Sequence, residues 1–132
     1  MISKTISYVD LNGNNQTEEH FFHLSKVEIS RMQVKMDGKY IDYLKDLVAG
    51  RHIEALFDVF YNLILDAHGE KSDDGKRFVK TPEKRAEFEQ SVAFSEFFTE
   101  MIGDMDKMAV FTKGVVPADL ATNMPEDLPA IE

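Results

Sequence analysis

The N-terminal segment most restricts the fold of this chain, because apolar and polar side chains alternate there on both sides of a tight turn. Over residues 2–9 a period-two pattern predicts a half-buried strand, with one apolar side formed by Ile2, Ile6 and Tyr8. The dipeptide Asn12-Gly13 is a strong hairpin signal, since both residues tolerate positive φ. We therefore expect a second strand over 16–23. A lone hairpin is marginally stable in water, so its apolar face must pack on helices or on another copy.

The following residues have the apolar spacing of short amphipathic helices. Ser25 and Glu28 form a capping-box pattern, which predicts a helix from about residue 26. The full set of expected helices is 26–35, 39–49, 51–67, 82–91, 92–102 and 104–113. The helix over 51–67 has the broadest apolar stripe, which is typical of a core helix. A polar loop is expected over 69–80, and Gly114 is expected to stop the last helix.

These elements predict an α+β fold that is mostly α. An N-terminal β-hairpin (1–24) is followed by five or six short helices, all within one domain over 1–114. From residue 115 the composition changes: there is no Lys or Arg, and three Pro and four carboxylates follow. We expect residues 115–132 to form an acidic, mobile C-terminal tail.

The charge of the chain argues against nucleic acid as a partner. The formal net charge is −9, and an acidic excess repels phosphate backbones. One basic cluster is interleaved with carboxylates, which favours a solvated mixed-charge loop: Lys71, Lys76, Arg77, Lys80, Lys84 and Arg85. There is no Cys, no signal-peptide pattern and no long apolar run, so we expect a soluble protein of the cytoplasm that does not contact a membrane.

No residue pattern predicts catalysis, a cofactor or a metal. The four His lack the helical i, i+4 spacing of a metal pair, and the acidic run after Asp66 fails the calcium-loop pattern at its sixth and twelfth positions. The chain has neither a Gly-rich phosphate loop nor a Gly-x-Ser-x-Gly turn. Glu96, between aromatic residues, comes closest to a perturbed carboxylate, but the polar face of an amphipathic helix explains it more simply.

The remaining candidate is a surface that binds other proteins. Phe94, Phe97, Phe98 and Met101 have the i, i+3, i+4, i+7 spacing of a helix that docks in a groove, and Met105 and Met108 extend the set. The same spacing is how a helix joins its own core, and this is the commoner outcome. Self-association through an unpaired hairpin edge is also expected.

The chain resembles the tail assembly chaperones of long-tailed bacteriophages, in particular those of phages and prophages of Gram-positive hosts. The resemblance covers nearly all of 1–120, and its most specific parts are the loop at 69–80 and the exit at 111–120. It also includes the hairpin turn at 10–13, the segment 21–28 and the stretch Phe94-Ser95-Glu96-Phe97-Phe98.

This resemblance implies a helical fold with a small β element, no enzyme activity and no cofactor. It implies that the chain binds the tape measure protein, keeps it soluble and helps to recruit the major tail protein as the tube polymerises. It further implies work in the host cytoplasm, absence from the mature virion, and a longer product of the same gene made by ribosomal frameshifting. Two alternatives stay open: a head–tail adaptor or connector subunit that is retained in the virion, and a small regulatory enzyme.

Overall fold

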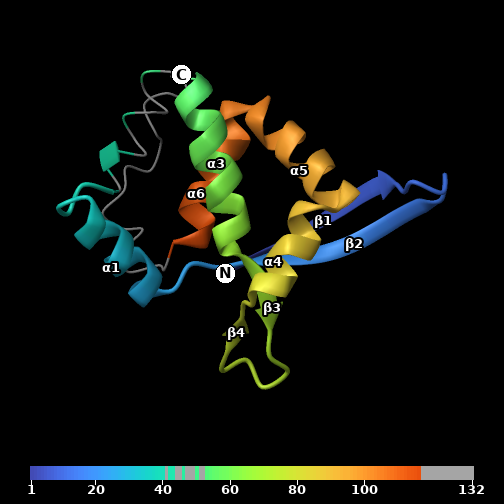
Figure 1. Cartoon of the computed structure of the whole chain (residues 1–132), viewed down its shortest axis with the longest axis horizontal. Helices are drawn as coiled ribbons and strands as arrows, with labels where there is room; N and C mark the ends of the chain where they lie inside the picture. Colours follow the sequence, from blue (N-terminus) through green and yellow to red (C-terminus); the bar gives the residue numbers. More distant parts are fainter. Residues whose placement is uncertain (41, 44–45, 47–49, 51–52, 117–132) are drawn as a thin grey trace.

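The computed structural model describes residues 1–40, 42–43, 46, 50 and 53–116 (Figure 1). Its elements are β1 (Ile2–Val9), β2 (Asn15–Phe22), α1 (Lys26–Lys35), α3 (Ile53–Ala67), β3 (His68–Lys71), β4 (Phe78–Val79), α4 (Pro82–Glu89), α5 (Val92–Ile102) and α6 (Met105–Val115). The predicted fold class is therefore confirmed. An N-terminal hairpin precedes five helices in the described part of the chain, and the helix expected over 39–49 lies largely outside it.

The sheet has four antiparallel strands in the order β1-β2-β3-β4. The polar loop predicted over 69–80 is in part a second hairpin, because β3 and β4 pair there on either side of a turn. The turn between them uses Gly75 at φ 74°, and the Ser72 N–H donates to the Arg77 carbonyl at 2.9 Å. Strands of four and two residues are too short to show an alternating pattern, so neither strand could be predicted from periodicity.

The first hairpin is an arm that extends beyond the helices (Figure 1). Its register pairs Ile2 with Phe22 and Ile6 with Glu18, so the predicted apolar side of β1 shares one face with alternate residues of β2. That face meets helices α5 and α6. The opposite face, which includes Ser3, Thr5 and Ser7, is exposed.

The core forms where the base of this hairpin meets the helices. Phe22 is fully buried, and its ring lies 5.2 Å from both Phe97 and Phe111 and 6.0 Å from Phe88, measured between centroids. One aromatic side chain thus contacts α4, α5 and α6 together. The core also holds the apolar stripe of α3, as predicted for that helix.

The helix starts follow their local sequence signals. The Ser25 hydroxyl accepts the Glu28 N–H, and the Glu28 carboxylate accepts the Ser25 N–H, so the predicted capping box is present. Thr81 caps α4, with Pro82 at the first helical position. Gly114 does not stop α6, which continues to Val115. A Cβ at this glycine would lie 2.8 Å from Ile2 Cγ2, so the absent side chain lets the first strand approach the last helix.

The described chain ends at two buried residues. Val115 is fully buried and Val116 is 4% exposed, so both belong to the core. The remainder of the predicted acidic tail lies outside the described residues, and the division of the chain near residue 114 stays a prediction.

Replacing Gly69 by Ala should destabilise the domain by roughly 2 kcal/mol or more, the range expected for overpacking a closed site. A Cβ there would lie 2.6 Å from Phe78 Cε2 and 2.7 Å from the Val79 carbonyl oxygen, and the backbone oxygen cannot move aside without breaking the β3–β4 pairing. Urea denaturation of Gly69→Ala measures the loss.

Gly103→Ala is the matched control. Its Cβ would lie 3.4 Å from the nearest atom, and the backbone is at φ −84°, which any residue adopts. We expect a change within about 0.5 kcal/mol. Equal midpoints for the two variants would contradict the close approach at Gly69.

Candidate partner-binding surfaces

The predicted partner-binding residues lie in the core of the chain itself. Phe94, Phe97, Phe98, Met101 and Met108 are each at most 5% exposed, and Met105 is half-buried against them. The apolar residues of α5 thus pack in the core of their own domain, which is the commoner outcome of this helical spacing. Partner binding by these side chains stays a prediction. A buried side chain can contact a partner only where it lines a groove that opens to the surface.

Two of the six line such an opening. A groove of about 300 Å³ lies between β1, α5 and α6, and we call it the apolar groove; its lining is Lys4, Thr5, Phe97, Glu100, Met101, Asp106, Lys107 and Val110. Val110, on α6, is 64% exposed. An ion pair between Lys107 Nζ and Glu100 Oε1, at 2.6 Å, lies along the same opening. An apolar base with charged groups beside it suits an apolar side chain of a partner.

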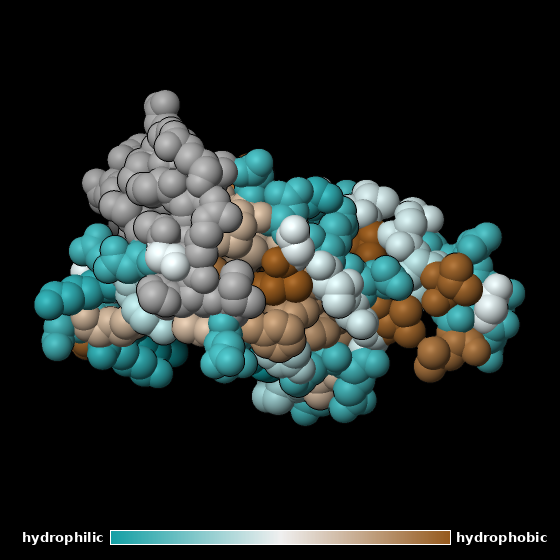
Figure 2. Space-filling model, turned by 90° about the horizontal axis from the view of Figure 1, so that it is seen from above, coloured by the Kyte–Doolittle hydropathy of each residue, from teal (hydrophilic) through white to brown (hydrophobic). Residues whose placement is uncertain are grey.

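A second apolar feature is the tip of the first hairpin. Leu11 is 91% exposed and Val9 is 57% exposed. Figure 2 shows apolar surface at this end of the molecule. The turn is well held, because the Asp10 carboxylate accepts the N–H groups of Asn12 and Asn14 at 2.9 Å. Leu11 therefore lies on an ordered turn, where a partner that covers it would remove its apolar surface from water.

The outer edge of β1 is also open in the described part of the chain. β1 pairs with β2 alone, and β4 forms the opposite edge of the sheet. An exposed edge strand presents backbone N–H and carbonyl groups to any further strand. The first hairpin thus offers both an apolar tip and a pairing edge.

A short chain of hydrogen bonds between polar side chains connects β1, β2 and β3. Tyr8 donates to Glu18 at 2.7 Å, His20 Nε2 lies 3.0 Å from the other Glu18 oxygen, and His20 Nδ1 lies 2.9 Å from His68 Nε2. Neutral rings satisfy every contact if His68 Nε2–H donates to His20 and His20 Nε2–H donates to Glu18. The hydrogen bonds from His20 and Tyr8 lower the pKa of Glu18.

His68 completes this chain of hydrogen bonds from the first position of β3, a strand that the sequence did not predict. Its ring stacks on Phe88 with a centroid distance of 3.7 Å. Its Nδ1 atom is buried without a hydrogen-bond partner. A second proton there would have no acceptor, and burial lowers the pKa of His68 to about 4.

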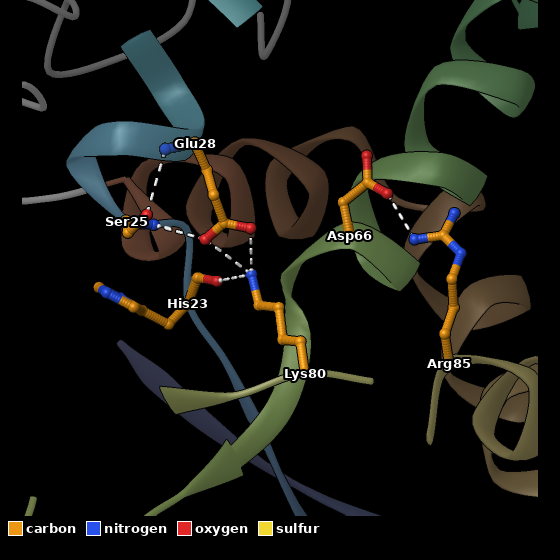
Figure 3. Close-up of polar contacts among 6 residues, drawn as sticks. All are labelled: His23, Ser25, Glu28, Asp66, Lys80 and Arg85. Carbon is orange, nitrogen blue, oxygen red and sulfur yellow. Dashed lines mark hydrogen bonds and ion pairs between the residues drawn. The ribbon is translucent and has the colours of Figure 1, made fainter. Parts of the chain in front are cut away.

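A third surface lies between α1 and α4, and we call it the basic groove. It has a volume of about 440 Å³, and its lining includes Arg31, Lys35, Lys80, Lys84 and Arg85. Lys80 donates to both Glu28 oxygens, at 2.7 and 2.9 Å, and to the His23 carbonyl at 2.8 Å (Figure 3). Although burial acts to raise it, the pKa of Glu28 is lowered by Lys80 and the Ser25 N–H. Arg85 pairs with Asp66.

The arrangement of the described residues offers surfaces that can bind a partner. In the described ranges, no three His, Asp or Glu side chains are placed to hold a metal ion. No helix in the same part of the chain has the length and apolarity needed to cross a bilayer. The surfaces that stand out are two apolar features and one basic groove, all of which suit contacts with polypeptide.

Comparison with known proteins agrees with a protein that works through such contacts. A family model described as phage tail assembly chaperone matches residues 1–130. The match covers almost the whole sequence, so this chain belongs to the phage tail assembly chaperone family. No curated protein and no solved structure matches it.

The position of His68 predicts a loss of stability in mild acid. Its pKa in the folded chain is about 4, below the ordinary value of 6.5, so the unfolded chain takes up a proton first as the pH falls. The stabilisation is fully present above pH 6.5 and is lost between pH 6.5 and 4. We expect a contribution of roughly 2 kcal/mol, smaller than the full shift implies because the side chain is only partly buried.

His68→Phe provides the comparison, because it keeps the stack on Phe88 and removes the titrating group. Urea midpoints measured from pH 7 to 4 should fall less steeply for this variant than for the unmodified chain. His23, whose pKa is also lowered, chiefly by burial, is present in both proteins and cancels in the difference. Parallel pH curves would show that His68 does not carry the effect.

Proposed function

We propose that this chain binds the tape measure protein, keeps it soluble and helps to recruit the major tail protein during assembly of the tail tube. The observation that carries this proposal is the apolar groove, with Val110 exposed beside it, in a member of the tail assembly chaperone family. A long helical partner with apolar stripes aggregates unless those stripes are covered.

The apolar groove suits one face of such a helix. Phe97 and Met101 form apolar parts of its lining, and methionine adapts its shape to different partners. Lys4, Lys107 and Asp106 supply both signs of charge around it, which would orient a helix without requiring one sequence. A chaperone that must cover many successive turns of one partner needs this kind of tolerance.

The proposed site of action is the host cytoplasm, and the chain leaves before the virion is complete. A head–tail adaptor would stay in the particle, so mass spectrometry of purified virions distinguishes the two functions. We further propose the longer frameshift product as a partner. A slippery nucleotide run before the stop codon of the gene is the feature to look for.

Co-expression with the tape measure protein encoded nearby tests the proposal. The fraction of tape measure protein that stays in the supernatant should rise strongly when this chain is present. Val110→Gln should weaken the complex about tenfold, because burial of one valine contributes roughly 1.5 kcal/mol.

Val34→Gln is the matched control, since Val34 is 78% exposed on α1 and does not line the apolar groove. It should leave the complex unchanged. A Val110→Gln chain that solubilises as well as the control would remove the apolar groove from the proposal. An insoluble tape measure protein in the presence of both the short and the long product would overturn the function itself.

We also propose that the chain self-associates through its first hairpin, using the β1 edge and the exposed Leu11. Static light scattering at rising concentration should give masses above the 15.1 kDa of one chain. Leu11→Asn should lower those masses without changing the urea midpoint, because the side chain contributes little to its own fold at 91% exposure. A constant monomer mass for the unmodified chain at high concentration would rule out this proposal.

A further inference from the structure

The basic groove concentrates positive charge on an acidic chain. Five of the 15 Lys and Arg residues line it, whereas Glu28 and Asp66 are its only lining carboxylates among the described residues. The chain as a whole carries −9. A depression with this local excess attracts an anionic segment, and its walls reduce screening by solvent.

The cations of the basic groove that form no ion pair with a described residue lie on α1. Arg31 and Lys35 are four residues apart on one face of the helix, both exposed, and neither forms an ion pair with any described residue. On the opposite wall, Lys84 pairs with the exposed Glu70, and such a surface pair exchanges readily for another. The groove therefore has cations available for a further carboxylate-bearing group.

The end of α6 contacts the segment that leads into α1, beside the basic groove. The Leu24 N–H donates to the Val115 carbonyl at 3.0 Å, and Lys80 binds the carbonyl of the adjacent residue, His23. Figure 3 shows Lys80, His23, Ser25 and Glu28 together at this place. Val115 and Lys80 thus bind opposite sides of the peptide bond between His23 and Leu24, so the described chain ends one peptide unit away from the Lys80 end of the basic groove.

The segment that follows has the matching chemistry. Residues 117–132 contain no Lys or Arg, and their acidic and large aliphatic side chains are Asp119, Glu126, Asp127, Glu132, Leu120, Leu128 and Ile131. Sixteen residues can span up to about 50 Å, and α1, with its 10 residues, is about 15 Å long. Length does not prevent the segment from following α1 from one end to the other.

We propose that residues 117–132 dock in the basic groove of their own chain. Their carboxylates face Arg31, Lys35 and Lys84, and their aliphatic side chains cover Met32 and Leu65, which also line the groove. The segment then competes with any acidic partner for this surface. The proposal does not depend on the apolar groove or on the tape measure protein.

Zero-length carbodiimide cross-linking of the full chain, read by mass spectrometry at low salt, tests this docking. The reagent joins a lysine amine to a carboxylate in direct contact. Lys35 and Lys84 should cross-link to Asp119, Glu126, Asp127 or Glu132 at least fivefold more than Lys76 does, which is exposed in the β3–β4 turn. The Lys107–Glu100 pair, at 2.6 Å, supplies an internal positive control. The cross-links should fall severalfold in 0.5 M NaCl.

Arg31→Glu should reduce these cross-links severalfold, whereas Arg77→Glu, an equal charge change at an exposed turn, should leave them unchanged. Mixing light and ¹⁵N-labelled chains separates docking within one chain from docking between two. Products of uniform isotope content support the proposal. Products of mixed content place the segment on a second copy and overturn it. Equal cross-linking of Lys35, Lys84 and Lys76 also overturns it, and this result would leave the co-expression test of the chaperone function unaffected.

Discussion

The burial of Phe22 is the contact on which the remaining structure depends. This ring ends β2 and meets Phe88, Phe97 and Phe111, one from each of the last three helices. A hairpin of this size is marginal alone, and short helices are marginal alone, so each part needs the surface that the other supplies. The exposed features at the far end of the hairpin are possible only because its base is fixed in this way.

Local signals in the sequence predicted the parts of the fold that local interactions determine. The Asn12-Gly13 turn, the Ser25–Glu28 capping box and the Thr81-Pro82 helix start each involve residues close in sequence, and all three are present. The strand β3 was missed because it pairs with β2, which is 48 residues away at Phe21 and Gly69, and β4 was missed because it pairs only with β3. Gly114 was misread for the same reason, since its contact is with Ile2.

The candidate surfaces were harder to predict than the fold. The apolar residues of α5 were recognised from their helical spacing. That spacing could not show whether they pack on another protein or on the core of their own domain, and the structure buries them in the core. The apolar groove joins Lys4 to Val110, and the His20–His68 pair joins two strands, so neither exists as a sequence motif. A surface that binds polypeptide needs no fixed set of reactive residues, which leaves little for pattern reading to detect.

The contact between Ile2 and Gly114 also bears on how the protein is made. The strand synthesised first packs against the helix synthesised last among those described, with 111 residues between them in the sequence. At roughly 5 to 20 residues per second, the ribosome takes on the order of 6 to 20 seconds to add the missing helix. Throughout that interval the apolar side of the first hairpin has no complete cover. A member of a chaperone family thus passes through a stage in which part of its own core is exposed.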